Sequence, residues 1–223
     1  MFNGFRIGAI LLMSGSGNRF GSEIPKQFLL LGKKKLYFHT LEALQSAQIF
    51  DEMILVTHPD WIETVASEVP RAKVIPGAMS RQGSCFCGLK AFSQPPDIVL
   101  VHDAVRPFVS KEILIQNIEQ AIIHGAVDTC IPSADTLVHA VDGLKIDHIP
   151  DRAHYYRGQT PQTFRYEWLM QAHVHSKREN ATDDCALVLE RGLPVHIVQG
   201  EDRNIKITTK FDINIAELIL NNN

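Results

Sequence analysis

Short apolar runs rich in β-branched residues alternate along the chain with longer stretches whose apolar residues recur at helical spacing. The runs at residues 5–13, 53–57, 73–75, 98–102 and 127–131 predict strands. The stretches at 38–48, 61–68, 82–92 and 111–123 predict helices, the last with Ser110 as its N-cap. Strands separated by helices indicate right-handed crossovers. The pattern therefore predicts an α/β fold, a Rossmann-like and mostly parallel sheet with helices on both faces.

Residues 134–156 break this alternation. Two short alternating runs, at 136–141 and 145–149, flank the turn signal Asp142-Gly143, which is typical of a β-hairpin. Because no helical stretch separates the two runs, we expect the hairpin to leave the main sheet as a protruding β-arm. Such an arm either covers a site, pairs with a second subunit, or is a solvated excursion without a role.

The last part of the chain returns to the alternation. Helices are predicted at 168–176, 183–191 and 211–220, and strands at 195–199 and 205–208. The sequence contains no internal repeat, low-complexity tract or flexible linker. We therefore expect residues 1–223 to form a single domain that carries the arm at 134–156.

Composition narrows the class of protein. The 223 residues carry a formal net charge of −3, which gives no basic field for nucleic acid or an anionic membrane. The longest apolar run is far shorter than the roughly 20 residues that span a bilayer. We expect a cytoplasmic protein with neither partner. The pair Cys85-x-Cys87 has no second pair at zinc spacing, so we do not expect a zinc enzyme.

The first predicted strand ends in a glycine-rich loop. The sequence runs Met13-Ser14-Gly15-Ser16-Gly17-Asn18-Arg19-Phe20-Gly21 and reaches Pro25-Lys26 soon after. Small residues let a phosphate approach backbone N–H groups that no strand partner uses, and Arg19 and Lys26 add two cations. The loop is therefore interpreted as a nucleotide-phosphate site, with an ordinary strand-to-helix turn as the alternative.

Two familiar phosphate motifs do not fit this loop. A Walker loop ends in Gly-Lys-Ser/Thr, which is absent here. A dinucleotide fingerprint needs its third glycine where Phe20 stands, and no acidic residue closes a convincing second strand about 20 residues later. An NAD-dependent oxidoreductase is therefore not favoured.

Four further groups could carry chemistry. Asp103 and Arg106 follow a buried strand, where open parallel sheets bind ligands; an ion pair between them is the alternative. The segment 157–162 is predicted to be a loop that presents Thr160. Thr182 and Asp183 precede a helix, where Asp183 is predicted to cap it. Lys206 interrupts an apolar run and either points to solvent or adds a further cation to the site.

Taken in order, these motifs resemble those of a known family. Lys26-Gln27, Asp103-x-x-Arg106, Thr160-Pro161-Gln162, Thr182-Asp183 and Ile205-Lys206 resemble the 2-C-methyl-D-erythritol 4-phosphate cytidylyltransferases. The ribitol 5-phosphate cytidylyltransferases share the same motifs. The resemblance extends from about residue 6 to residue 220.

The resemblance implies a role for each matching residue. Arg19, Lys26 and Asp103 would be catalytic, with Asp103 also holding Mg²⁺. CTP would be bound by a set that includes the first loop: Met13, Ser14, Gly15, Gly17, Arg81, Ser84 and Lys206. The acceptor would be bound by Arg106, Thr160, Thr182 and Lys206, and by Thr136 and Arg152 from the arm of a neighbouring subunit. A homodimer joined through the arm is expected.

The implied reaction transfers CMP from CTP to the phosphate of 2-C-methyl-D-erythritol 4-phosphate, with ribitol 5-phosphate as the alternative acceptor. A nucleotide-binding regulatory module without activity is the alternative from another class. Three positions depart from the family's usual spelling. Ser14 stands in the first loop, and Ala78 and Met79 stand in Gly77-Ala78-Met79-Ser80-Arg81, where the family usually has a second glycine and a polar residue.

Overall fold

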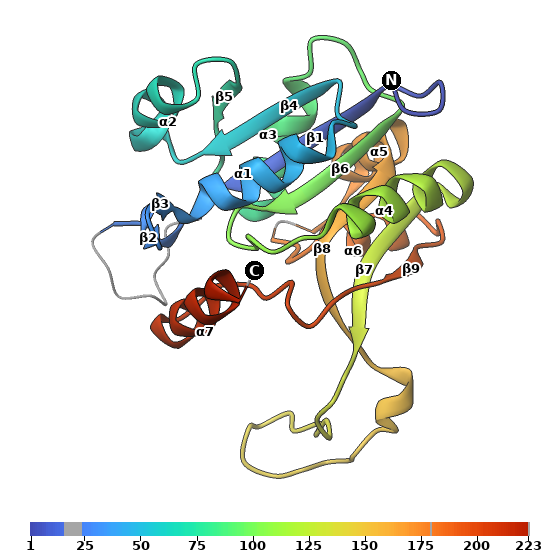
Figure 1. Ribbon diagram of the computed structural model, residues 1–223. Helices are drawn as coiled ribbons and strands as arrows, with labels where there is room; N and C mark the ends of the chain where they lie inside the picture. Colours follow the sequence, from blue (N-terminus) through green and yellow to red (C-terminus); the bar gives the residue numbers. More distant parts are fainter. Residues whose placement is uncertain (16–23, 179, 223) are drawn as a thin grey trace.

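The computed structural model describes residues 1–15, 24–178 and 180–222. Its centre is a seven-stranded sheet in the order β5-β4-β1-β6-β8-β7-β9 (Figure 1). The strands are β1 (Ile7–Met13), β4 (Glu52–Thr57), β5 (Lys73–Pro76), β6 (Ile98–Asp103), β7 (Ala126–Pro132), β8 (Tyr156–Arg165) and β9 (His196–Gln199). Neighbouring strands are parallel except that β8 runs antiparallel to both β6 and β7. The mostly parallel α/β sheet is confirmed.

Helices cover both faces of this sheet (Figure 1). Helices α1 (Leu36–Ala47) and α4 (Lys111–His124) pack on one face, and α3 (Arg81–Lys90), α5 (Tyr166–His175) and α6 (Cys185–Glu190) pack on the other. Two further helices are α2 (Ile62–Glu68), beside β5, and α7 (Lys210–Asn221), near the short ribbon of β2 (Leu30–Leu31) and β3 (Lys34–Lys35). As predicted, Ser110 caps α4, because its hydroxyl accepts a hydrogen bond from the N–H of Ile113.

The sheet has a hydrophobic core on each face, and successive side chains of β1 point alternately into one core and the other. Ile7, Leu11 and Met13 join the cluster under α1 and α4, whereas Ile10 and Leu12 join the cluster under α3, α5 and α6. Every residue of β1 is buried, as expected for a central strand covered on both faces. This rigid central strand fixes the position from which the first loop leaves the sheet.

Two predicted elements are wrong. The segment 157–162, expected to be a loop, belongs to β8, where the polar side chains of Gln159, Thr160 and Gln162 are buried. Side-chain hydrogen bonds to Glu201, His102 and Asp128 satisfy these polar groups, so the segment lacks the apolar pattern from which a strand is predicted. The predicted strand at 205–208 forms no ladder; Ile207 donates one backbone hydrogen bond to Val105 and buries its side chain beside α7.

The arm at 134–156 extends away from the sheet from the ends of β7 and β8 (Figure 1). The predicted arm is present, but its two sides do not form regular strands. Its sides are joined by an isolated bridge between His139 and His148, and a short 3-10 helix, Arg152–His154, precedes β8. The predicted turn at Asp142-Gly143 is present, and Gly143 has a φ of +70°, which favours glycine.

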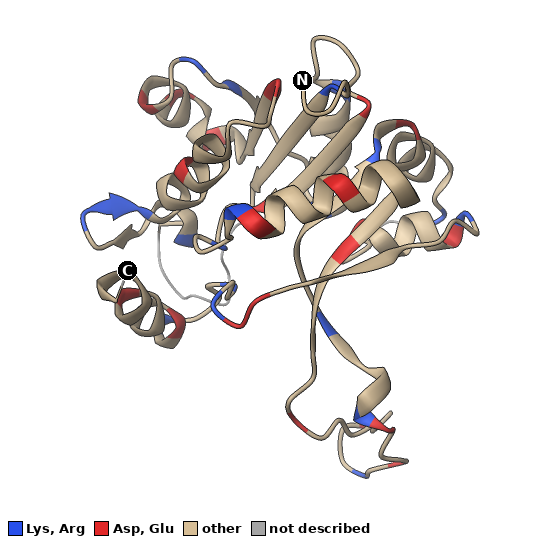
Figure 2. Ribbon diagram, turned by 45° about the vertical axis from the view of Figure 1, so that its right-hand side comes forward, with Lys and Arg blue, Asp and Glu red and all other residues tan. Residues whose placement is uncertain are grey.

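Among the helices that the structure describes, none has the length and apolar character needed to cross a bilayer. Charged residues occur along the helices, in the loops between elements and on the arm (Figure 2).

Candidate active site

The register of the parallel strands brings four loops to one edge of the sheet. Leu12 of β1 lies opposite Asp103 of β6, and Met13 lies opposite Thr57 of β4. Thr57 in turn lies opposite Pro76 of β5. The loops that follow β1, β4, β5 and β6 therefore leave the sheet side by side at its carboxyl edge. Ligands bind at this edge in open α/β sheets.

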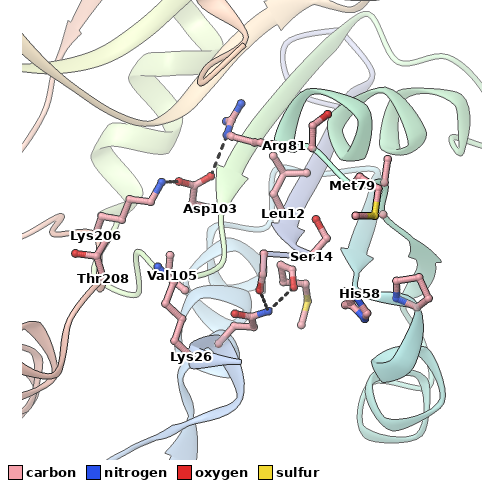
Figure 3. Close-up of a pocket in the computed structure, with 17 residues that line it drawn as sticks. Leu12, Ser14, Lys26, His58, Met79, Arg81, Asp103, Val105, Lys206 and Thr208 are labelled. Carbon is pink, nitrogen blue, oxygen red and sulfur yellow. Dashed lines mark hydrogen bonds and ion pairs between the residues drawn. The ribbon is translucent and has the colours of Figure 1, made fainter. Parts of the chain in front are cut away.

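Two adjoining cavities lie at this edge. The larger, of about 600 Å³, is lined by the first loop with Lys26 and by the loops after β4 and β5, including His58 and Met79 (Figure 3). The smaller, of about 230 Å³, is lined by Arg106, Asp128, Gly158, Gln159, Thr160, Gln162, Thr182 and Asp183. Arg81, Asp103 and Lys206 line both cavities. Two ligands bound side by side would thus meet at these three side chains.

Asp103 lies between two cations at this junction. Its Oδ2 is 2.6 Å from Nζ of Lys206, and its Oδ1 is 3.5 Å from Nε of Arg81 (Figure 3). Burial favours the neutral acid, but the positive charges of Arg81 and Lys206 outweigh burial and hold the pKa of Asp103 well below its usual range. The carboxylate is therefore ionised at neutral pH, and Lys206, although its side chain is 37% exposed, points into the site.

The alternative of an ion pair between Asp103 and Arg106 is wrong. The Nη1 of Arg106 donates to the carbonyl oxygen of Asn204 at 2.8 Å, and its side chain is buried. The Nε of the same guanidinium has no hydrogen-bond partner among the described atoms. Arg106 is thus a buried cation at the wall of the smaller cavity with donor capacity left over.

Arg81 is fixed from behind by a buried network. Its Nη1 lies 2.6 Å from Oδ2 of Asp184, whose Oδ1 lies 2.9 Å from Nε2 of His173. The ring of His173 stacks on Phe86 at 5.6 Å. Burial opposes ionisation of Asp184, but the charge of Arg81 lowers its pKa. Cys85 lies in the same cluster as His173 and Asp184. The guanidinium of Arg81 already compensates the negative charge of Asp184.

A chain of three hydrogen bonds orders the end of β6. Burial lowers the pKa of His102 to about 4, so its ring is neutral at pH 7. Because the carbonyl of Arg106 can only accept, Nε2 of His102 carries the proton and donates to it at 3.2 Å. Nδ1 then accepts from the hydroxyl of Thr160 at 2.9 Å, and Thr160 Oγ1 accepts from the N–H of Asp103 at 3.1 Å. Thr160 therefore positions Asp103.

The first loop is held by two side chains. Nε2 of Gln27 donates to the carbonyl oxygens of Met13 and Gly15, at 2.7 and 3.0 Å. The hydroxyl of Ser14 donates to that of Ser84 at 2.8 Å. Met13, Ser14 and Gly15 line the larger cavity, whereas Ser84 is fully buried beneath them.

The loop after β5 packs directly on the first loop. A Cβ on Gly77 would lie 2.5 Å from Cβ of Ser14 and 2.8 Å from Oγ of Ser84, so no larger residue fits without a shift. The N–H of Ala78 donates to Oγ of Ser84 at 3.1 Å, so a protein group already uses this donor. Met79 is fully exposed at the mouth of the larger cavity.

The other predicted residues fall in three places. Gly17 and Arg19 lie outside the described residues. Thr182 lines the smaller cavity, and the neighbouring Asp183 accepts from the N–H of Ala186 at 2.8 Å, as its capping role predicted. Thr136 and Arg152 are exposed on the arm and do not line either cavity of this chain.

Sequence reasoning missed the residues that support the site. Gln27, Asp184, His173 and Asn204 are all buried and hydrogen-bonded around the cavities. Asp184 stood beside the predicted Thr182-Asp183 pair, and that acidic run was its signal. No feature of the sequence marked His173, because its partner, Asp184, lies eleven residues away at the start of another helix.

A mostly parallel sheet with cations gathered around the carboxylate of Asp103 at its carboxyl edge defines the class, an α/β nucleotidyltransferase. The comparisons make this specific. The family model described as 2-C-methyl-D-erythritol 4-phosphate cytidylyltransferase matches residues 7–222, and the chain belongs to this family. It is accordingly a cytidylyltransferase.

Individual relatives agree over nearly the whole chain. The chain is 36% identical over 220 residues to the 2-C-methyl-D-erythritol 4-phosphate cytidylyltransferase of Clostridium botulinum, covering 95% of this chain and 96% of that protein. The crystal structure of 4-diphosphocytidyl-2C-methyl-D-erythritol synthase from Anaerococcus prevotii matches with a TM-score of 0.85 at 32% identity, covering 98% of this chain and 100% of that one. The Thermus thermophilus cytidylyltransferase matches with a TM-score of 0.78 at 32% identity, over 95% and 98%.

Proposed function

We propose that this chain transfers the cytidylyl group of CTP to the phosphate of 2-C-methyl-D-erythritol 4-phosphate. The products are pyrophosphate and 4-diphosphocytidyl-2-C-methyl-D-erythritol, an intermediate of isoprenoid biosynthesis. The observation that carries the proposal is the position of Asp103, Arg81 and Lys206 where the two cavities join. CTP would occupy the larger cavity and the acceptor the smaller one, so their phosphates meet beside these charges.

The reaction requires that the two substrates be positioned, but it does not require a strong base. A phosphate ester is largely ionised near pH 7, so its oxygen can attack the α-phosphorus of CTP directly. As that P–O bond forms, the bond from the α-phosphorus to the bridging oxygen of the β-phosphate breaks and pyrophosphate leaves. Lys26, at the wall of the larger cavity, would stabilise the negative charge that builds up. We assign the same role to Arg19.

The remaining contacts divide between the two substrates. Met13, Ser14, Gly15 and Gly17 would present the loop to CTP, with Arg81 and Lys206 at its phosphates and Ser84 holding the loop in place. Arg106, Thr182 and Lys206 would contact the acceptor. Thr160 lines the same cavity and orders Asp103.

Mg²⁺ fits the donor set at the junction. Magnesium typically takes one or two carboxylates and completes its shell with phosphate oxygens and water. Asp103 offers such a carboxylate, and its two ion pairs leave lone pairs available. Asp103 would hold the ion, which when bound would neutralise part of the phosphate charge.

We further propose that the chain forms one catalytic domain and dimerises through the arm at 134–156. The arm exposes Val138, Val141, Leu144, Ile146 and Ile149, an apolar set that would be covered by a second copy. Thr136 and Arg152 of one copy would then reach the acceptor cavity of the other. Mixing Arg152→Ala with Lys26→Ala chains tests this, because hybrid dimers regain one complete site; no regain of activity would contradict it.

We place the activity in the cytoplasm. All four cysteines are free thiols in the structure, three of them buried. Free thiols are typical of a reducing compartment.

Pyrophosphate release tests the reaction itself. The assay supplies CTP and Mg²⁺ with either 2-C-methyl-D-erythritol 4-phosphate or ribitol 5-phosphate. Release with the first acceptor at the higher kcat/KM is the expected result. Higher kcat/KM with ribitol 5-phosphate would overturn the assigned acceptor, and CTP binding without release on either acceptor would overturn the activity.

A further inference from the structure

Asp128 is a carboxylate of the smaller cavity that neither the family motifs nor the proposed reaction uses. It lies on β7, opposite Gln162 of β8, and lines the cavity together with Arg106, Thr182 and Asp183. It does not line the larger cavity. Any group that Asp128 contacts therefore belongs to the ligand of the smaller cavity.

The backbone at Asp128 is irregular. The pairing of β7 with β8 shifts register between Asp128 and Cys130, as at a β-bulge or a similar irregularity. Bulges redirect side chains and occur next to active sites. Gly158 faces the carboxylate across the bulge, and even a Cβ there would lie 3.4 Å from Oδ2 of Asp128. A side chain longer than alanine at position 158 would grow over this oxygen.

The carboxylate has acceptor capacity to spare. Its Oδ1 accepts from Nε2 of Gln162 at 3.1 Å, and its Oδ2 accepts from the thiol of Cys130 at 3.4 Å. An ionised carboxylate offers about four lone-pair sites, so about two remain for a ligand. Burial, with a smaller contribution from the nearby Asp183, raises the pKa of Asp128 to about 6, although Arg106 and the hydrogen bonds from Gln162 and Cys130 oppose this rise. At pH 7, which lies above this pKa, Asp128 is ionised in most molecules.

The charges along the smaller cavity are asymmetric. Lys206 and Arg81 stand at the junction with the larger cavity, where the acceptor phosphate must lie to reach the α-phosphorus. Asp128 and Asp183 line only the smaller cavity. Of the described residues that do so, Arg106 alone is cationic, so the two carboxylates outnumber it there. A carboxylate repels phosphate and accepts hydrogen bonds from hydroxyl groups. This arrangement suits a ligand with a phosphate at one end and hydroxyls at the other.

We propose that Asp128 determines acceptor specificity by accepting hydrogen bonds from hydroxyl groups of the acceptor's polyol chain. This inference rests on the proposed function for the position of the acceptor, but it adds a residue and a selection rule to it. Charge-assisted hydrogen bonds are roughly twice as strong as neutral ones. A buried acceptor left unpaired penalises a ligand that lacks the matching hydroxyl. Asp128 would thus favour one polyol over another of similar length.

The variant Asp128→Asn tests this with little change of shape. In the pyrophosphate-release assay, we expect KM for the preferred acceptor to rise at least about tenfold, the effect of losing a hydrogen bond to a charged group. The ratio of kcat/KM between 2-C-methyl-D-erythritol 4-phosphate and ribitol 5-phosphate should change by a similar factor, with KM for CTP within about twofold of the original. A merely structural role would change both substrates together.

Glu52→Gln is the matched control. Glu52 is also a hydrogen-bonded carboxylate on a strand of the same sheet, but it lines neither cavity and bonds to Arg6 and Ser93. It should leave the acceptor ratio unchanged. An Asp128→Asn enzyme whose acceptor KM and acceptor ratio equal those of the unchanged chain would overturn the inference.

Calorimetry separates the two proposals. If the unchanged chain releases no pyrophosphate with either acceptor, the proposed function fails. Titration of each acceptor phosphate into both chains then still decides the role of Asp128. Acceptor binding weakened in Asp128→Asn, with CTP binding intact, supports the inference, and equal acceptor affinities overturn it.

Discussion

Nη1 of Arg81 lies 2.6 Å from Oδ2 of Asp184, and Nε of the same guanidinium faces Asp103 at 3.5 Å. Arg81 therefore connects a buried structural carboxylate to the carboxylate at the junction of the two cavities. Asp184 itself lines neither cavity. Its contribution to the site is to fix where the positive charge of Arg81 lies.

Asp184→Asn should weaken both the fold and the site. Removing one partner of a buried ion pair typically costs about 3–5 kcal/mol, because the other charge is left without compensation. The side chain of Asp184 is 1% exposed and that of Arg81 is 21% exposed, so we expect the lower end of that range. Urea denaturation measures the loss. Steady-state kinetics should also show a raised KM for CTP, since Arg81 is no longer held in place.

Glu190→Gln provides the control for this prediction. Glu190 faces Arg178 at 3.7 Å in a pair whose arginine is 58% exposed. Surface pairs of this kind contribute about 0–1 kcal/mol. If Asp184→Asn and Glu190→Gln had equal effects on stability, the buried network would not have the role argued for it.

Much of this arrangement could be predicted from the sequence, because the apolar pattern reports burial. The strands β1, β4 and β6 are continuous apolar runs, and the register of parallel strands then brings their carboxyl ends together. Asp103 could be placed at that edge for this reason alone. Arg106 could be placed nearby, although its partner, the carbonyl of Asn204, lies 98 residues away.

The rest could not be predicted because it depends on buried polar contacts between distant segments. In β8 the buried side chains include Gln159, Thr160 and Gln162, which no hydrophobic pattern marks as a strand. Lys206 was hard to predict for a different reason, because it is a charged residue within an apolar run. An isolated lysine in an apolar run usually faces solvent, but here the charge of Asp103 draws it into the site.

Lys26→Ala should lower turnover strongly. Lys26 lines the larger cavity at the start of a 3-10 helix, Lys26–Phe28, and the next residue, Gln27, is pinned to the first loop. Loss of one group that stabilises transition-state charge typically costs about 10²–10³ in kcat. Pyrophosphate release at saturating substrates measures it. Lys34→Ala is the matched control, because Lys34 forms an exposed pair with Glu42; near-normal kcat in Lys26→Ala would remove Lys26 from the mechanism.

Gly77→Ala should disturb the contact between the first loop and the loop after β5. The new Cβ would lie 2.5 Å from Cβ of Ser14 and 2.8 Å from Oγ of Ser84, so the loops must separate. Forced overpacking typically costs about 1–3 kcal/mol. We expect lower stability in urea and a raised KM for CTP.

A second substitution makes this prediction specific. Ser14→Gly removes the nearer of the two clashing atoms, so the double variant should recover part of the loss. Gly15→Ala serves as a control for stability alone, because its Cβ would meet nothing within 4 Å. Additive effects of Gly77→Ala and Ser14→Gly would show that the two loops do not pack as described.

Asp128→Asn should make the fold more stable at neutral pH. Burial raises the pKa of Asp128 from its ordinary value of 3.8 to about 6. Between these values the folded chain binds more protons than the unfolded chain, so stability falls as pH rises through this window and the cost is complete near pH 7. At 1.36 kcal/mol per pKa unit, a shift of roughly two units gives a cost of up to about 3 kcal/mol. Asparagine does not titrate, so the Asp128→Asn chain should not carry this cost.

Urea denaturation of both chains from pH 4 to pH 8 measures this difference. Asp128→Asn should exceed the unchanged chain by about 1–3 kcal/mol at pH 7, and the gap should close towards pH 4. His102, whose pKa burial lowers to about 4, has the opposite dependence, because its unfolded form binds the extra proton. That dependence is common to both chains and cancels in the difference. A gap that stays constant with pH would mean that Asp128 is not the partly buried, ionised acceptor on which hydroxyl recognition depends.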